Sequence, residues 1–231
     1  MVVKFDLNLH KRFLVNLLIE ICKALGDKVA FKGGTSALLF YNLNRFSFDL
    51  DFDILKPFTK EDIDKIKEIL SKNGNIKDYY NKRFTVFFLF DYQKNYPNIK
   101  LEFNKRLLKN SSYKTVWFMG VKIKIADETT SLTNKLIALA NRRQSVSRDL
   151  FDLYYFLNLG FPINEKLIKE KTGKSKKQYL NYLIKFIKKI YTSRNVLQGL
   201  GESLEREQKE WVKEKLILDT IKQLKKRISG K

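Results

Sequence analysis

Alternating aspartates in one short segment are the residues best suited to chemistry in this chain. In Phe48-Asp49-Leu50-Asp51-Phe52-Asp53-Ile54, acidic and apolar side chains take turns. Side chains of a β-strand point to opposite faces with a period of two, so the segment predicts a strand with one acidic and one apolar face. Carboxylates about 6 Å apart, at an effective dielectric constant of about 20, repel each other by about 3 kcal/mol per pair. The fold must compensate for this repulsion.

Two kinds of compensation are open. One is a hard divalent cation, Mg²⁺ or Mn²⁺, which binds oxygen ligands and shares its coordination sphere with water and substrate phosphates. The other is an edge strand whose acidic face simply meets water. The aspartates alone do not decide between a metal site and a solvated edge.

A glycine turn upstream favours the metal site. Residues 28–31 predict a short strand, and Gly33-Gly34 allows the chain to turn and to approach a ligand closely. Thr35 is then expected to cap a helix over residues 36–43. A helix that begins there would aim backbone N–H groups at an anion such as a triphosphate. The turn followed by an Asp-x-Asp strand therefore indicates a site for a nucleoside triphosphate (NTP) and a metal.

Charged residues on two later predicted helices could complete such a site. Lys135 and Arg142 are seven positions apart, so they share one helix face and could contact a polyphosphate together. Asp149 and Asp152, three apart, are neighbours on the next helix. Taken singly, each residue is better explained by a solvated face or a surface ion pair. Their order after the glycine and aspartate signals favours a functional role for Lys135 and Asp149.

A third carboxylate could come from a later strand. Residues 84–90 predict an apolar strand, and residues 99–103 predict its partner. Leu101 and Phe103 would face inward, which leaves Glu102 on the opposite face. Glu102 is thus a candidate third ligand, or a base that activates the attacking hydroxyl. A solvent-facing strand glutamate explains it equally well.

Several of these motifs resemble one known family. The runs Lys32–Leu39 and Arg45–Phe52 are similar to the first motif of the AbiEii/AbiGii-type nucleotidyltransferases, members of the DNA polymerase β-like superfamily. Ser131–Arg143 is similar to the family's lysine-to-arginine helix, and Arg148–Tyr154 to its closing Arg-Asp-x-x-Asp-Leu motif. The resemblance covers residues from about 30 to about 156. The last third of the chain carries no motif of this kind.

The resemblance implies metal-dependent transfer of a nucleoside monophosphate from an NTP, and some members are toxins paired with an antitoxin protein. It implies metal binding by Asp49 and Asp51, whereas Asp53 is expected to be structural. The expected catalytic residues are Asp49, Asp51, Lys135, Asp149 and Glu102. The expected nucleotide-binding residues are Lys32, Gly33, Gly34, Thr35, Arg45, Ser47 and Arg142.

The elements that must position these residues predict an α+β fold. Residues 1–126 are expected to form a nucleotidyltransferase-like core with a mixed β-sheet flanked by helices. From residue 127 to 231 the pattern is almost entirely helical. An amphipathic helix over residues 9–25 opens the chain, a helix over 60–72 follows the acidic strand, and further strands are expected near 116–118 and 121–125.

Composition predicts an intracellular protein. The 231 residues are 44% hydrophobic and 13% aromatic, enough for a sizeable core. The single cysteine, Cys22, permits no disulfide within the chain, and the lone His10 excludes the usual zinc patterns. No signal peptide and no apolar run of membrane-spanning length is evident, so no membrane partner is expected and the cytoplasm is the expected location.

Charge points to a polyanionic partner. Lysine and arginine number 46 against 25 acidic residues, which gives a formal net charge of +21. Such an excess favours RNA as the acceptor, for example a tRNA 3′ end. Transfer to a protein or a small molecule is an alternative, and so is a basic RNA-binding module without turnover.

Overall fold

The chain divides into two compact units. A computed structural model describes residues 6–106, 108–141 and 147–230. The first unit comprises the described residues within Met1–Asn42, Ser47–Leu107 and Tyr113–Ala126. The second comprises those within Leu43–Phe46, Leu108–Ser112 and Asp127–Lys231. The short insertions at 43–46 and 108–112 thus depart from the single boundary expected after residue 126.

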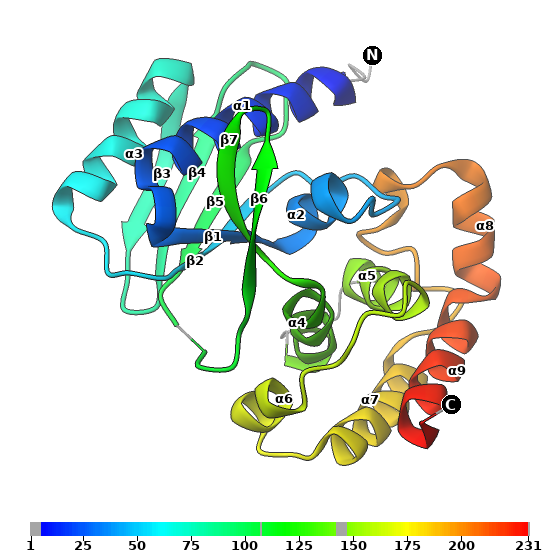
Figure 1. The fold of residues 1–231 in the computed structure, drawn as a ribbon. Coiled ribbons are helices and arrows are strands. Elements are labelled where there is room, and N and C mark those ends of the chain that lie inside the picture. Colours follow the sequence, from blue (N-terminus) through cyan, green and yellow to red (C-terminus); the bar gives the residue numbers. More distant parts are fainter. Residues whose placement is uncertain (1–5, 107, 142–146, 231) are drawn as a thin grey trace. The chain divides into compact units, whose positions relative to one another are not determined.

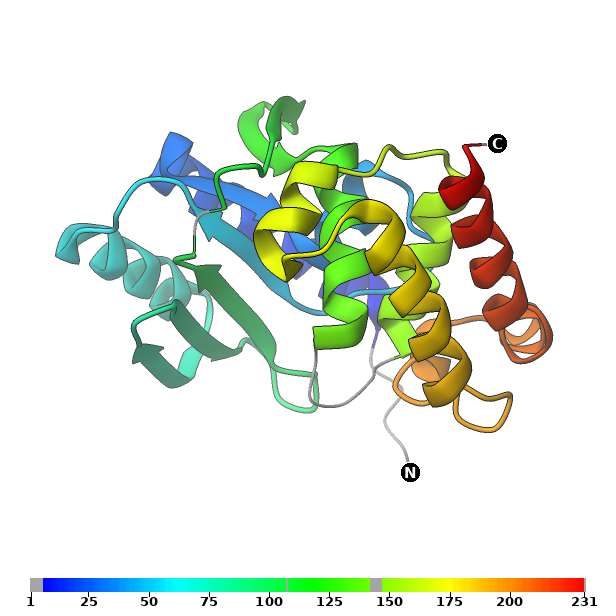
Figure 2. The same ribbon diagram turned by 90° about the horizontal axis from the view of Figure 1, so that it is seen from below.

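The first unit is built on a mixed β-sheet (Figures 1 and 2). Its strands are β1 (Val29–Lys32), β2 (Leu50–Ile54), β3 (Asn75–Asn81), β4 (Thr85–Asp91), β5 (Ile99–Asn104), β6 (Tyr113–Phe118) and β7 (Val121–Ala126). Their order in the seven-stranded sheet is β3-β4-β5-β2-β1-β7-β6. The pairs β1/β7 and β2/β5 are parallel, and the other neighbours are antiparallel. This mixed sheet with helices confirms the predicted α+β class.

One face of the sheet carries the apolar core of the unit. Phe52, Phe88 and Phe103 project from three adjacent strands and are fully buried. The Phe52 and Phe103 rings stack with centroids 4.9 Å apart. Two amphipathic helices supply buried side chains to this unit, α1 (Leu7–Leu25) and α3 (Lys60–Asn73), which pack against each other. Alternation along the strands therefore leaves the polar residues of β2 and β5 on the opposite face.

Local capping residues explain where α1 and α3 begin, whereas α2 begins earlier than the sequence predicted. Asp6 caps α1, and Thr59 forms a capping box with Asp62 at the start of α3. Helix α2 (Gly33–Phe40) starts three residues earlier than expected, with Lys32 at its N-cap position. Thr35 is therefore not the cap: its hydroxyl donates a hydrogen bond to the backbone carbonyl of Asp49 instead.

Strand β3 was not expected from the sequence. Its residues, Asn-Ile-Lys-Asp-Tyr-Tyr-Asn, include no long apolar alternation, and most are exposed or half-buried. It lies at the edge of the sheet and pairs only with β4 among the described strands. Edge strands tolerate polar residues because only one side needs a partner.

The second unit is helical. It contains α4 (Glu128–Asn141), α5 (Ser147–Asn158), α6 (Glu165–Thr172), α7 (Lys176–Ile190), α8 (Arg206–Glu214) and α9 (Leu216–Ser229). Helix α5 packs against α4 and α9, and α7 also contacts α9 (Figure 1). Tyr179 is buried, and its hydroxyl donates to the carbonyl of Leu136. Over the described residues, no helix combines the length and apolar character needed to cross a membrane.

Candidate functional site

Gly33 and Asp51 make the closest approach in the glycine turn. Gly33 opens α2 with φ of 82°, a conformation that favours glycine. A Cβ atom added to Gly33 would lie 2.2 Å from Oδ2 of Asp51 and 2.9 Å from its Cγ. Glycine thus creates the space in which the Asp51 carboxylate lies, beside the N-terminus of α2.

The backbone before β2 is tied to the same helix. The Thr35 hydroxyl holds the carbonyl of Asp49, so α2 fixes the segment that carries the first aspartate. The Asp49 side chain is half-buried, and Ser47 is buried just before it. Ser36, in the first turn of α2, has a buried hydroxyl without a hydrogen-bond partner among the described residues. Sequence reasoning missed Ser36, although it directly follows the glycine turn.

Asp53 is held differently from Asp51. Its buried carboxylate accepts hydrogen bonds from the ammonium of Lys32, from the Asn104 side chain at 2.7 Å and from the Tyr113 hydroxyl at 3.0 Å. These partners come from β1, β5 and β6. Lys32, expected to bind nucleotide, is therefore engaged in an ion pair within the sheet. Asn104 shares the face of Glu102 two residues away, a signal the sequence offered, whereas nothing local indicates Tyr113.

Glu102 lies next to Asp51 in the sheet. The parallel pairing of β2 and β5 places these two residues opposite each other, and Lys32 is opposite Asp51 on the other side. The Glu102 side chain is exposed. Across the described residues, no three His, Cys, Asp or Glu side chains form a group that could hold a metal ion. The structure thus aligns Glu102 with Asp51 along the sheet but does not gather a three-carboxylate cluster.

The donors present nevertheless suit a hard cation that also binds a substrate. Mg²⁺ is usually held by one or two carboxylates, with water and phosphate oxygens completing its shell. Asp49 and Asp51 supply carboxylate oxygens two residues apart. The space kept open by Gly33 places one of these oxygens at the helix end that would also attract a phosphate. The residues therefore fit a metal shared with a nucleotide.

The second unit contains a buried ion network around Asp152. Arg45 donates to both carboxylate oxygens of Asp152, from Nε at 2.6 Å and from an Nη at 2.7 Å. Nζ of Lys135 lies 2.7 Å from Asp152 and 3.2 Å from Asp149. The sequence-predicted residues Lys135, Asp149 and Arg45 are thus brought together within this unit. Arg142 lies outside the described residues.

Burial and charge act in opposite directions in this network. Burial on its own would raise the pKa of Asp152, but the Arg45 and Lys135 cations outweigh it and lower that pKa to about 2. Burial would likewise lower the pKa of Lys135, but Asp152 and Asp149 outweigh it and raise that pKa above its ordinary value. Arg45, Lys135 and Asp152 therefore all stay charged at neutral pH.

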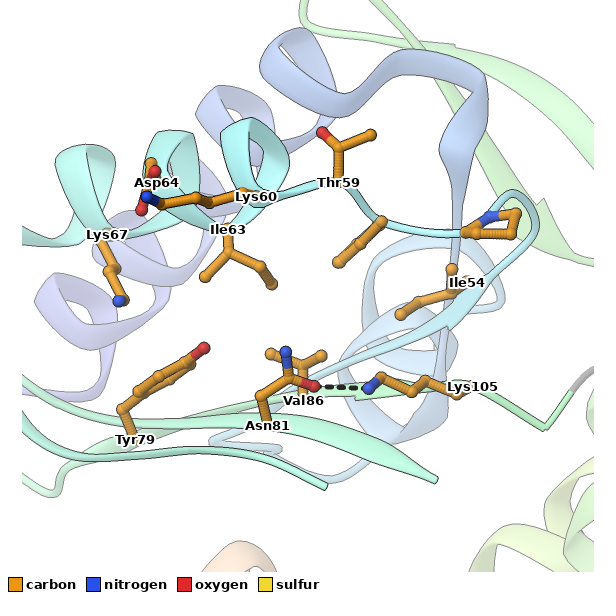
Figure 3. Close-up of a pocket in the computed structure, with 12 residues that line it drawn as sticks. Ile54, Thr59, Lys60, Ile63, Asp64, Lys67, Tyr79, Asn81, Val86 and Lys105 are labelled. Carbon is orange, nitrogen blue, oxygen red and sulfur yellow. Dashed lines mark hydrogen bonds between the residues drawn. The ribbon is translucent and has the colours of Figure 1, made fainter. Parts of the chain in front are cut away.

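A cavity lies on the other face of the sheet, between β3, β4 and α3 (Figure 3). Its volume is about 580 Å³, and Figure 3 shows Tyr79 and Asn81 pointing into it beneath Ile63 and Lys67. Ile54, which lines it, alternates along β2 with Asp51 and Asp53. The cavity and the aspartates are therefore on opposite faces of the sheet.

The chain matches the family model described as "Nucleotidyl transferase AbiEii toxin, Type IV TA system" over residues 16–230. No curated protein matches it. A candidate nucleotidyltransferase from H. pylori of known crystal structure is 21% identical, with 96% of each chain covered and a TM-score of 0.60. JHP933 from Helicobacter pylori is 22% identical, with 95% of each chain covered and a TM-score of 0.55. These two structures share the fold with the chain.

Proposed function

Because the chain belongs to the AbiEii nucleotidyl transferase toxin family, and is thus a nucleotidyltransferase, we propose that it moves a nucleoside monophosphate from an NTP to a hydroxyl of RNA. Family membership implies an NTP substrate and an antitoxin partner. The observation that carries the finer proposal is the approach of Asp51 to Gly33 at the start of α2. It supports one site for both phosphates and a metal.

The start of α2 would bind the triphosphate. Gly33 and Gly34 have no side chains of their own to cover their backbone N–H groups, and the helix dipole favours an anion there. The buried Ser36 hydroxyl could donate to a phosphate oxygen and so gain the partner that it lacks among the described residues. Thr35 would act through Asp49, whose backbone it holds.

Asp49 and Asp51 would hold Mg²⁺ or Mn²⁺. A carboxylate and a triphosphate at one helix end repel each other unless a cation lies between them. When bound, the metal would neutralise charge on the phosphates and fix their orientation. Asp53, already bound to Lys32, would maintain the sheet beneath them.

Lys135 would neutralise charge on the leaving pyrophosphate, with Asp149 and Asp152 holding its ammonium in place. Arg45 keeps Asp152 charged and would act as a positioning residue. Glu102 remains a candidate base for the acceptor hydroxyl. RNA is the preferred acceptor because of the net charge of +21.

The test combines the protein with each NTP labelled on its α-phosphate, Mg²⁺ and total RNA. We expect label on RNA, lost with EDTA and in Asp49→Asn and Asp51→Asn. Asp27→Asn is the matched control because this side chain is 70% exposed and outside the site. Label on protein or on small molecules would overturn the RNA assignment. RNA binding without transfer of any label would overturn the catalytic role of these residues.

A further inference from the structure

We propose that an aromatic platform formed by Tyr80, Phe84 and Phe87 binds unpaired bases of the RNA acceptor, a few nucleotides from its reacting hydroxyl. Three cations, Lys82, Arg83 and Arg106, accompany these rings. The identity of the acceptor rests on the proposed function. Binding of RNA to the platform can nevertheless be measured without transfer.

A single row of residues across the sheet links the platform to the aspartates. Asp51 is opposite Glu102, Glu102 is opposite Phe87, and Phe87 is opposite Tyr80. Residues opposite each other in adjacent strands project from the same face. With strands about 4.8 Å apart, Phe87 is about 10 Å and Tyr80 about 14 Å from Asp51 along the row. The Phe87 and Tyr80 rings thus lie on the acidic face of the sheet, away from the cavity of Figure 3.

Tyr80 and Phe87 form a stacked pair. Their ring centroids are 4.8 Å apart, and their planes differ by 14°. Both side chains are half-buried, so each keeps part of its surface open. Nζ of Lys82 lies 4.4 Å from the Tyr80 centroid. A cation beside a fixed ring provides two of the contacts that unpaired nucleotides use, a stacking surface and a partner for phosphate.

Phe84, which we include in the platform, lies in the adjoining loop between β3 and β4. Its side chain is 42% exposed. The guanidinium of Arg106 lies 4.0 Å from the ring centroid and that of Arg83 lies 5.0 Å from it. The N–H of Lys105 donates to the Phe84 carbonyl at 2.9 Å, which ties this loop to the end of β5. Guanidinium groups both stack on rings and bind phosphate, so this corner suits a nucleotide.

Charge selects RNA rather than an apolar protein partner. The exposed ring is flanked by cations, whereas the core of a protein interface is depleted of charge. Two acidic residues share this face, Asp78 opposite Leu89 and Glu102 opposite Phe87. The cations instead lie at the loop end of the platform, and we place the bound RNA there. A span of 10–14 Å corresponds to about three or four stacked nucleotides at about 3.4 Å each. The platform would therefore bind bases near the third or fourth position from the reacting end.

The test measures binding of a fluorescent single-stranded RNA octamer by anisotropy, without NTP. We expect Tyr80→Leu with Phe87→Leu, and separately Phe84→Leu, to weaken binding about tenfold. Tyr80→Phe should bind as the unchanged protein does. Tyr79→Leu is the matched control because Tyr79 is the adjacent tyrosine of β3 and faces the cavity (Figure 3). Thermal unfolding of each variant checks that the fold is kept.

Unchanged affinity in both leucine variants would overturn the platform, and so would an equal loss in Tyr79→Leu. Equal affinity for a duplex would overturn the assignment to unpaired bases, and stronger binding of a DNA octamer would overturn the assignment to RNA. Platform-dependent RNA binding without any nucleotidyl transfer would contradict the proposed function alone. Transfer to RNA with unaltered affinity in the leucine variants would contradict the platform alone.

Discussion

Gly33 leaves the space that the Asp51 carboxylate fills: a single carbon atom added to the glycine would lie 2.2 Å from Oδ2 of the aspartate. The two residues are eighteen positions apart in the sequence. The contact joins the first residue of α2 to the second residue of β2, so the glycine turn and the acidic strand act as one structure.

Gly33→Ala should reduce nucleotidyl transfer about 100-fold, because Asp51 must move and displacements near 1 Å at a reacting centre cost about that much. The positive φ of Gly33 adds about 1–2 kcal/mol of strain. Gly120→Ala is the matched control: its φ is 77° and nothing lies within 4 Å of an added Cβ. The two variants are compared by their transfer rates and by their unfolding in urea. Equal activity loss in the two variants would show that strain alone is responsible.

Asp53→Ala and Asp51→Ala should separate stability from activity. Removing Asp53 leaves the ammonium of Lys32 without its carboxylate inside the sheet, which should lower the unfolding free energy by about 2–3 kcal/mol. Removing the half-buried Asp51 should change it by less than about 1 kcal/mol but abolish transfer. Denaturant unfolding and a transfer assay test the pair. Similar losses of stability in both variants would contradict a structural role for Asp53 and a catalytic role for Asp51.

Asp152→Ala should destabilise the protein by about 3–5 kcal/mol, because it leaves Arg45 and Lys135 charged and buried. The exposed pair of Glu68 and Lys72 provides the control, and Glu68→Ala should cost less than about 1 kcal/mol. The pKa of Asp152 is lowered from 3.8 to about 2, so its contribution is fully present above pH 3.8 and is lost as the pH falls through about 2. Urea unfolding at several pH values across that range should show this pH dependence of stability in the unchanged protein and not in Asp152→Ala.

His10 allows a direct measurement of burial, because it is the only histidine in the chain. Burial lowers its pKa below 6.5, although a backbone hydrogen bond to Phe48 opposes this, and its Nδ1 lies 2.6 Å from the Tyr92 hydroxyl. The unfolded chain therefore binds a proton more readily, and stability should fall as the pH drops below 6.5. NMR titration of the imidazole and unfolding at several pH values test this. His10→Gln should flatten the pH dependence; an unchanged slope would assign it to other groups.

The sequence was most informative where chemistry and periodicity agreed. Alternation from residue 48 onward predicted a strand with one acidic and one apolar face, and residues 99–103 predicted a strand with Glu102 opposite its apolar face. Strands are present at Leu50–Ile54 and Ile99–Asn104. The α+β class and the family followed from the same motifs. Strand β3 was missed because its pairing with β4 depends on a long-range partner, and its polar residues carry no periodic apolar signal.

Contacts between distant residues could not be predicted. Lys32 and Arg45 both looked available for nucleotide, yet each binds an aspartate, Asp53 and Asp152 respectively. Which cation meets which carboxylate is decided by strand register and helix packing, which the spacing of residues along one chain does not encode. The start of α2 at Gly33 rather than after Thr35 has a similar origin, since Thr35 finds its partner in the backbone of Asp49.

The four residues Leu43–Phe46 have a consequence for how this enzyme can be dissected. They belong to the helical unit, although the residues on either side of them, up to Asn42 and from Ser47, belong to the sheet unit. Arg45 is fastened there by Asp152, only four positions before Asp49. The segment that leads into the acidic strand is therefore anchored by the part of the chain that a conventional truncation would discard. Fragments that end near residue 126 would lack this anchor, so we expect them to be poor tests of activity.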